Sequence, residues 1–246
     1  MVDRFYILLI NLMVFVSCFA CNETSPTVSE VTESNEDVSE GNVELLYMGQ
    51  ASVRIITETG KVIYVDPFSG EDYSLPADLI LVTHEHFDHN AVDKVANRNN
   101  GCRIIRSRDA IQDGEYCPFK LDYVLVVPVE AGFNRMHDKK NCVGYVLTFN
   151  NGKNVYLSGD TSTTNQMRDG TMAEKKLDYA FLCTDGYYNM DNLEAAKAAE
   201  LINAVHTVPY HNSIANDGYN FNDEYAEQFN VRGKLIIKPG ESIIMD

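Results

Sequence analysis

The sequence predicts an α+β domain built as a four-layer αβ/βα sandwich, with two β-sheets between outer helices. Three observations support this prediction. Short apolar strand segments dominate the first part of the domain, helical segments alternate with strands in the second part, and turns rich in Gly or Asn separate neighbouring strands. Two sheets covered by helices are one of the few ways in which such elements can bury their apolar faces together. With 45% hydrophobic residues, the 246-residue chain can form one packed domain, which we place at 43–246.

The expected strands begin at Val43. Two of their connections have turn residues, Glu58-Thr59-Gly60 and the hairpin Asn150-Asn151-Gly152. The run 77–84 is continuously apolar before it ends in polar residues, as expected of a strand covered on both faces. The expected strands are 43–48, 52–58, 61–67, 77–84, 102–106, 122–129, 142–150, 153–160, 178–184, 204–211, and a closing hairpin of 234–240 with 241–245.

Three helices are expected. A short one spans 89–98, and a last one spans 221–231. The segment 190–204 is rich in Ala, Leu and Glu, which favour helix. Asp191 can cap its N-terminus, and Glu194 follows at the spacing of a capping box.

The N-terminal segment resembles a targeting signal. Residues 5–20 are almost all apolar, follow Arg4, and are short for a membrane span. Either Cys18 or Cys21 suits a lipoprotein processing site, although neither fits the usual pattern well. We therefore divide the start of the chain into a signal, 1–21, and a flexible acidic tether, 22–42. This predicts export and a lipid anchor at the bacterial cell envelope; a cleaved soluble form and an uncleaved anchor are the alternatives.

The charge of the chain argues against nucleic acid as a main partner. The formal net charge is −16, and no run of Lys or Arg appears. Six acidic residues without a Lys or Arg lie in 22–42, so the remainder carries about −10. A small-molecule substrate is the expected partner.

Four cysteines lie in the domain: Cys102, Cys117, Cys142 and Cys183. None has a CxxC spacing, so a thiolate zinc site is not expected. They are interpreted as small buried hydrophobic residues, with disulfides as the alternative outside the cytoplasm.

The strongest chemical signal is the segment THEHFDHN, residues 83–90, where an apolar strand ends in His84, His86, Asp88 and His89. Imidazole and carboxylate are ligands that suit Zn²⁺ and similar cations. Alternation along an extended chain places His84 and His86 on one side. Four such residues in six positions could serve two neighbouring cations. The alternative is a solvated polar strand end, but three of the chain's six histidines fall within these six positions.

This segment resembles the HxHxDH signature of the metallo-β-lactamase superfamily. The resemblance runs from Val43 to the C-terminus, with Asp66 in VDPF, Asp160 in SGDTS and His211 in VPYHN in the family's order. VDPF, GFNRMHDKKNCVGY and DGYYNMDNLEAA further resemble the ascorbate-phosphate-lactonase-like branch of its metal-dependent hydrolases. Phe133 and Asn189 depart from that branch, which leaves substrate contacts more open than metal contacts.

The resemblance implies one metal held by His84, His86 and His137, and a second held by Asp88, His89 and His211. Asp160 would bridge them. Asp66 and Asn134 would orient ligands by hydrogen bonds, and Asp185, Tyr188 and Met190 would line the cleft. As alternatives, His137 is a surface residue of a polar loop and Asp66 a plain turn residue. His206 is interpreted as structural.

The implied function is hydrolysis of an ester, lactone, amide or phosphoester by a metal-activated hydroxide, with Asp88 accepting a proton. Two divalent ions are expected; Zn²⁺ is the first choice, and Mn²⁺ or Fe suits the same ligands. The alternatives are a phosphodiesterase or nuclease on the same scaffold, and a metal-binding lipoprotein without turnover. The substrate and the oligomeric state cannot be inferred from the sequence.

Overall fold

The computed structural model describes residues 41–213 and 218–245, which belong to one compact unit. The predicted signal 1–21 and all but the last two residues of the tether 22–42 lie outside the described residues, so export and lipid anchoring stay predictions. Among the described helices, none has the length and apolar character that crossing a membrane requires.

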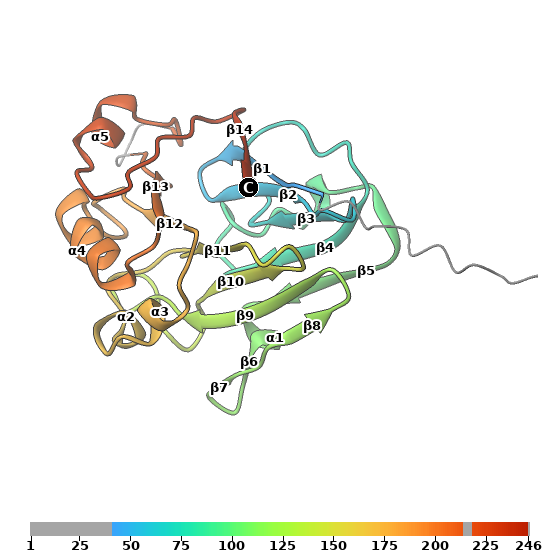
Figure 1. Ribbon diagram of the computed structural model, residues 1–246, viewed down its shortest axis with the longest axis horizontal. Helices are drawn as coiled ribbons and strands as arrows, with labels where there is room; N and C mark the ends of the chain where they lie inside the picture. The colour runs from blue at the N-terminus through green and yellow to red at the C-terminus, as the bar shows by residue number, and fades with distance from the viewer. Residues whose placement is uncertain (1–40, 214–217, 246) are drawn as a thin grey trace, which may run out of the picture. The chain divides into compact units, whose positions relative to one another are not determined.

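Two six-stranded sheets form the body of the unit (Figure 1). The first has the order β14-β1-β2-β3-β4-β5 and the second the order β13-β12-β11-β10-β9-β8. The strands of the first sheet are β1 (Val43–Gly49), β2 (Ser52–Ile56), β3 (Val62–Val65), β4 (Ala77–Val82), β5 (Arg98–Arg106) and β14 (Ser242–Met245). Those of the second are β8 (Phe119–Leu121), β9 (Val124–Glu130), β10 (Val143–Phe149), β11 (Asn154–Leu157), β12 (Tyr179–Cys183) and β13 (His206–Tyr210).

Short elements complete the unit. The strands β6 (Ile111–Gln112) and β7 (Glu115–Tyr116) pair with each other. The helices α2 to α5 gather on the β12–β13 side (Figure 1). The helices are α1 (Ser107–Ala110), α2 (Asn165–Arg168), α3 (Thr171–Glu174), α4 (Asn192–Ile202) and α5 (Asp223–Gln228).

The core lies between the two sheets. One inner face contributes side chains such as Leu45 and Val53, and the other contributes Tyr145 and Phe181; all four are 0% exposed. Full burial of one such side chain contributes roughly 1.5–3 kcal/mol. α4 packs on β12 through buried Ala and Ile side chains, whose small size brings the helix close to the sheet. The predicted α+β sandwich is therefore confirmed.

Parallel pairing fixes where functional residues can meet. β3 pairs parallel with β4, and β11, β12 and β13 are parallel to one another. Parallel strands end at the same edge of their sheet. The loops that follow β3 and β4, and those that follow β11, β12 and β13, therefore lie at one end of the sandwich. The hydrogen bond from the His211 N–H to the Gln50 carbonyl, at 3.0 Å, joins the two sheets there.

The predicted helix 89–98 is wrong. Only a 3₁₀ turn forms, at Val92–Lys94, and β5 already begins at Arg98, where it pairs with β4. Val92 and Val95 pack with Tyr73 in a separate apolar cluster on the first sheet. Arg98 is already paired in extended conformation, and Val92 and Val95 are held in this cluster. Too few residues of 89–98 therefore remain for a helix. The layer over this sheet is therefore a loop with one turn.

The closing hairpin is also wrong. Segment 234–240 forms no strand beyond an isolated bridge between Lys234 and Thr207. β14 pairs antiparallel with β1 instead, with Leu45 opposite Ile243. The free edge of β1 offers a full ladder of backbone groups to β14, which a two-stranded hairpin outside the sheets would lack.

The later helices and the turns follow the sequence more closely. Asp191 caps α4 by accepting a hydrogen bond from the Glu194 N–H at 2.7 Å. The Glu194 carboxylate accepts from the N–H and hydroxyl of Thr163. The predicted last helix shortens to α5. The hairpin Asn150-Asn151-Gly152 joins β10 and β11 as predicted. The four domain cysteines are free; Cys142 and Cys183 are buried as interpreted, whereas Cys102 and Cys117 are only partly buried, so the interpretation is wrong for these two.

Candidate metal centre

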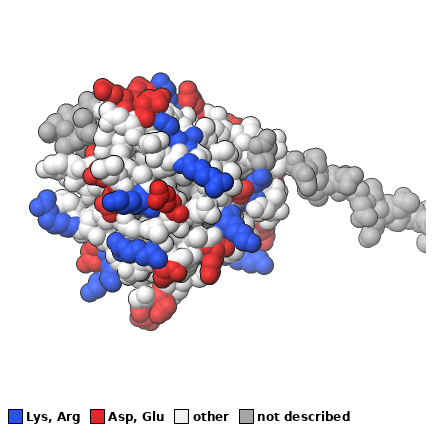
Figure 2. Space-filling model, turned by 60° about the vertical axis from the view of Figure 1, so that its left-hand side comes forward, with Lys and Arg blue, Asp and Glu red and all other residues white. Residues whose placement is uncertain are grey.

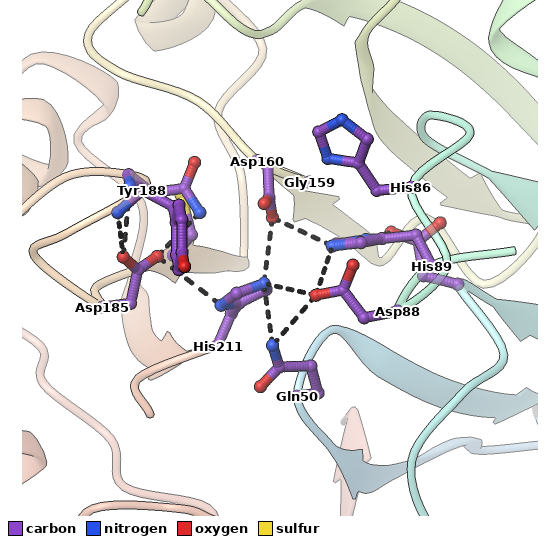
Figure 3. A network of polar contacts seen from close by, with 12 residues as sticks. Gln50, His86, Asp88, His89, Gly159, Asp160, Asp185, Tyr188 and His211 are labelled. Atoms are coloured by element: carbon purple, nitrogen blue, oxygen red, sulfur yellow. Dashed lines mark hydrogen bonds and ion pairs between the residues drawn. The ribbon is translucent and has the colours of Figure 1, made fainter. Parts of the chain in front are cut away.

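Five of the six histidines and two aspartates, Asp88 and Asp160, meet at the shared end of the two sheets. Figure 3 shows His86, His89 and His211 of this group with both aspartates. β4 delivers His84 shortly after its last residue. A turn closed by the His89 N–H on the His86 carbonyl, at 3.0 Å, then bends the chain. This bend lets His86 and His89 face different parts of the centre, as the sequence predicted from their spacing.

The first group of candidate ligands, called the outer set, is His84, His86 and His137. His137 comes from the loop between β9 and β10, and its Nε2 lies 3.2 Å from Nδ1 of His86. His84 and His137 are buried, whereas His86 is exposed. The alternative interpretation of His137 as a surface residue does not fit, because it is 3% exposed and points into the site.

The second group, called the inner set, is Asp88, His89 and His211. His211 follows β13. Oδ2 of Asp88 lies 3.8 Å from Nε2 of His89 and 3.7 Å from Nε2 of His211. The His89 side chain is 0% exposed and that of His211 is 4% exposed. The inner set therefore lies deeper than the outer set.

Asp160, which follows β11, lies between the two sets. Its Oδ1 is 3.2 Å from Nε2 of His89 and 3.3 Å from Nε2 of His211, and its Oδ2 is 3.2 Å from Nε2 of His137. One carboxylate oxygen thus faces each set. Figure 3 shows the contacts of Asp160 with His89 and His211. This is the arrangement that a bridging ligand requires.

The spacing and the unpartnered atoms fit metal coordination. Tetrahedral ligands at about 2.0–2.1 Å from Zn²⁺ lie ~3.3 Å from one another, close to the separations around Asp160. Nε2 of His84, Nε2 of His89 and Oδ1 of Asp160 are buried without a hydrogen-bond partner. Buried polar atoms are rarely left unsatisfied, and a cation would satisfy all three. The residues present therefore fit a pair of divalent cations.

Asp66, directly after β3, orients candidate ligands through hydrogen bonds, direct or through Thr83, to their ring atoms that face away from the centre. Its Oδ2 accepts hydrogen bonds from Nδ1 of His89 at 2.8 Å and from the Thr83 hydroxyl at 2.6 Å. The Thr83 hydroxyl in turn lies 3.1 Å from Nδ1 of His84. These contacts leave both Nε2 atoms directed into the site. Asp66 is 1% exposed and has φ +44°, a conformation that Asp tolerates better than most residues.

Asn134 has the corresponding position for His137. Its Oδ1 lies 3.1 Å from Nδ1 of His137 and accepts the backbone N–H of the same residue at 2.9 Å. This contact directs Nε2 of His137 toward His86 and Asp160. The structure therefore places both Asp66 and Asn134 where the resemblance implied.

Gln50 was missed in the sequence. Its Nε2 lies 3.3 Å from Oδ2 of Asp88 and 3.1 Å from Nε2 of His211. The available signal was a polar residue in the tight turn between β1 and β2, where Gln50 is 4% exposed with φ +51°. A turn residue is commonly polar, so that signal does not distinguish a functional residue from an ordinary one.

The segment after β12 is placed in part as expected. Oδ2 of Asp185 lies 3.6 Å from Nδ1 of His211, and Tyr188 lies beside Asp185 (Figure 3). Met190 does not line a cleft, because it is 0% exposed and packs in the core. His206 stacks on Tyr179 at 5.0 Å between ring centroids, at the far end of β13 from the centre.

Gly159 permits the close approach of the Asp160 loop. It has φ +58°, and a Cβ on it would meet the Thr83 side chain at 2.8 Å. Its N–H donates to the Tyr210 hydroxyl at 2.8 Å. A side chain here would push the Asp160 carboxylate away from the histidines.

The electrostatics differ between the two sets. Burial lowers the pKa of His84 well below its usual value, and burial with the neighbouring His137 lowers that of His86. Burial alone would lower the pKa of His89, but the Asp160 and Asp66 carboxylates outweigh it and raise that pKa well above its usual value. The pKa of His211 is also raised, because Asp160 and Asp88 outweigh burial.

Both carboxylates stay ionised. Burial would raise the pKa of Asp160, but His211 and His89 hold it well below its usual range. Burial acts in the same direction on Asp88, whose pKa is held low by the nearby His211 and His89. Ionised carboxylates are the form that coordinates a cation.

A cavity of about 520 Å³ adjoins the outer set. Its lining includes His84, His86 and His137 together with Glu85, Arg108, Asp138 and Lys140. Pockets of about 300–1,000 Å³ are typical of small-ligand sites. The exposed side of the centre therefore has room for a substrate.

Comparison with known proteins shows the family of this chain. The family model described as a beta-lactamase superfamily domain matches residues 44–211. A metal-dependent hydrolase of Pyrococcus furiosus is 32% identical over 229 residues, covering 82% of this chain and 99% of that protein. A metal-dependent hydrolase of Thermococcus kodakarensis is 31% identical over 227 residues, covering 82% of this chain and 99% of that protein.

A solved structure shares the fold. The metallo hydrolase Igni18 of Ignicoccus hospitalis superposes with a TM-score of 0.65 at 23% identity, covering 83% of this chain and 99% of that chain. Fold, sequence match and the gathered ligands agree, and the protein belongs to the metallo-β-lactamase superfamily as a metal-dependent hydrolase.

Proposed function

We propose that this hydrolase uses a dinuclear centre, with His84, His86 and His137 holding one cation, Asp88, His89 and His211 the other, and Asp160 shared. The observation that carries the proposal is the position of Asp160, whose two oxygens face different histidine sets at 3.2–3.3 Å. Two neighbouring cations, when bound, polarise a substrate oxygen and lower the pKa of a shared water from about 15.7 toward 7. Zn²⁺ is the first candidate, and Mn²⁺ or Fe suits the same donors.

Asp88 is the residue placed to move a proton. It is ionised, and its side chain is 14% exposed compared with 5% for Asp160, so it is the more accessible of the two carboxylates. The Gln50 amide holds Oδ2 of Asp88 at 3.3 Å and leaves the other oxygen available. We propose that this carboxylate orients the attacking water and accepts its proton.

The cavity supports a small substrate. Arg108 and Lys140 in its lining are balanced by Glu85 and Asp138. On the face shown in Figure 2, Lys and Arg side chains alternate with Asp and Glu. A nuclease needs an extended basic track for a phosphate backbone. We therefore propose an ester, lactone or amide as substrate, ahead of the alternative, a phosphodiester.

Metal analysis tests the centre. After loading with Zn²⁺ and removal of excess metal, the wild-type chain is expected to retain two ions, and Asp160→Asn at most one. Loss of the shared charge should lower turnover by at least about 10³-fold, because it disturbs both cations at once. His206→Ala is the matched control, since it removes a histidine outside the centre. Fewer than one ion in the wild type would overturn the dinuclear proposal.

A substrate panel tests the chemistry. Aryl esters, γ- and δ-lactones, thioesters, aryl amides and bis(p-nitrophenyl) phosphate should be compared at one defined metal content. We expect turnover of at least one carbonyl substrate and its loss in His86→Ala. Exclusive hydrolysis of the phosphodiester would favour the alternative, and unchanged turnover in His86→Ala would show that the catalytic site lies elsewhere.

A further inference from the structure

The exposed aromatic side chains are concentrated beside the metal centre. Among residues 41–213 and 218–245, the Phe and Tyr residues classed as exposed are Phe87 at 64%, Tyr187 at 62%, Tyr188 at 45% and Tyr219 at 43%. The other described rings are buried or partly buried. Large exposed apolar surface is unfavourable in water, and its clustering marks a binding surface.

Three rings form one side of this surface. Phe87 contacts Tyr219 at 5.9 Å and Phe68 at 5.8 Å between ring centroids, and Phe68 contacts Tyr219 at 5.3 Å. All three contacts are edge-to-face, so the rings keep one another in place and leave ring faces available. Phe87 stands in the chain between two candidate ligands, His86 and Asp88, which places the group beside the centre.

Two tyrosines form the other side. Tyr187 and Tyr188 contact each other edge-to-face at 4.6 Å. Oδ1 of Asp185 accepts both of their backbone N–H groups, at 2.8 and 2.6 Å. The other oxygen of Asp185 lies 3.6 Å from His211, which ties this pair to the inner set.

Both sides are tied to the centre by geometry, because Phe87 is flanked in the chain by His86 and Asp88, and Asp185 lies 3.6 Å from His211. Partial burial raises the pKa of Tyr219, and Asp88 and Tyr188 raise it further. Tyr219 also holds φ +65°, a conformation unfavourable for a bulky residue. Such strain persists where the surroundings enforce it and is common at ligand sites. Five rings in two groups, together called the aromatic rim, thus lie beside the centre: Phe68, Phe87, Tyr187, Tyr188 and Tyr219.

We propose that the aromatic rim binds an aryl or medium-chain acyl group of the substrate while the scissile carbonyl lies at the metal centre. The inference rests on the proposed dinuclear hydrolase and adds a substrate class to it. The polar cavity beside the outer set would take the opposite, polar end of the substrate. The substrate class is therefore a carbonyl compound with one apolar arm.

Binding of two hydroxamates to the full-length, Zn²⁺-loaded protein tests this proposal without requiring turnover. Acetohydroxamate reports the metal centre alone, and 2-naphthohydroxamate adds an apolar arm. We expect calorimetry to show the naphthyl compound binding at least about tenfold tighter. Tyr219→Asn and Phe87→Ser should each remove most of this preference; Asn is chosen because it tolerates positive φ. Val205→Ser, 62% exposed at the opposite end of β13, is the matched control and should keep the preference.

The outcomes separate the two proposals. Equal affinity of the wild type for both compounds, or a preference that survives the Phe87→Ser/Tyr219→Asn double variant, would overturn the aromatic rim. If acetohydroxamate does not bind at all, the proposal of a dinuclear centre is overturned. The aromatic rim is then tested separately, by the fluorescence of 1-anilinonaphthalene-8-sulfonate added to metal-stripped protein. Enhanced fluorescence that the double variant loses supports the rim, and fluorescence equal in wild type and double variant overturns it.

Discussion

The inner and outer sets of candidate ligands offer similar donor atoms in different surroundings. Both histidines of the inner set are buried, and Asp66 and Gln50 hold the side chains of this set from strand ends of the first sheet. The outer set includes the exposed His86, and its His137 lies in a loop. Asn134 of the same loop holds His137 by hydrogen bonds. The outer set also lines the cavity.

This difference indicates a division of tasks. Ligands fixed by buried hydrogen bonds keep a cation in place, because little conformational freedom is lost when it binds. Ligands beside a cavity leave one side of their cation accessible to substrate. The inner set is therefore suited to retention of metal and the outer set to exchange and substrate contact. Three experiments would break or sharpen this comparison.

The largest expected difference is in the stability of the metal-stripped protein. His89→Ala removes one partner from each of the buried carboxylates of Asp66 and Asp160, and we expect a loss of about 2–4 kcal/mol in the free energy of unfolding. His86→Ala should cost less than about 1 kcal/mol, because its side chain is exposed. Urea unfolding in the presence of a chelator measures both. Equal losses in the two variants would remove the structural distinction between the sets.

A smaller difference is expected between the two supporting residues. Asp66→Asn should weaken metal affinity by about 10–100-fold, because Asp66 directs His89 itself and His84 through Thr83. Asn134→Ala should affect only the cation of the outer set, and by about tenfold or less. Competition with a chromophoric chelator would measure both steps of binding. A larger effect from Asn134→Ala would reverse the assignment of the more firmly held set.

The smallest expected difference is in pH dependence. The pKa values of His89 and His211 are raised, so below those values a proton must leave before a cation binds, and affinity at the inner set rises with pH. The pKa values of His84 and His86 are lowered, so at neutral pH they have no proton to displace. For each proton that the cation displaces, the affinity of the inner set should fall roughly tenfold when the pH is lowered by one unit.

Calorimetry in buffers of different ionisation enthalpy would count those protons. The His86→Ala variant isolates the inner set, and the second binding step of the wild type then reports the outer set. More protons released at the outer set than at the inner set would contradict the expected order.

The candidate site was largely predictable. The spacing of His84, His86, Asp88 and His89 after an apolar strand indicates a metal site from chemistry alone. Asp160, His211 and His137 are ordinary polar residues without the family resemblance, since nothing local to them indicates a ligand. Thr83 and Gln50 were missed as supporting residues, because their roles depend on contacts with remote segments: Asp66 for Thr83, and His211 for Gln50.

The fold shows the same limit. Local periodicity and turn residues were sufficient for most strands and for the cap at Asp191, because side-chain alternation and capping are properties of a few neighbouring residues. The helix predicted at 89–98 failed because parallel pairing of β5 with β4 requires extended chain from Arg98. The closing hairpin failed because β1 offered β14 a free edge.

By itself, the sequence determined which residues can bind a cation and which segments must be buried, because both depend on side-chain chemistry and on spacing along the chain. The tertiary structure alone decided that Asp160 stands between two candidate ligand sets and that two groups of aromatic rings lie beside them. Those positions arise from strand pairing and loop backbone conformation, including positive φ at Gln50, Asp66, His211 and Tyr219, which sequence periodicity does not encode.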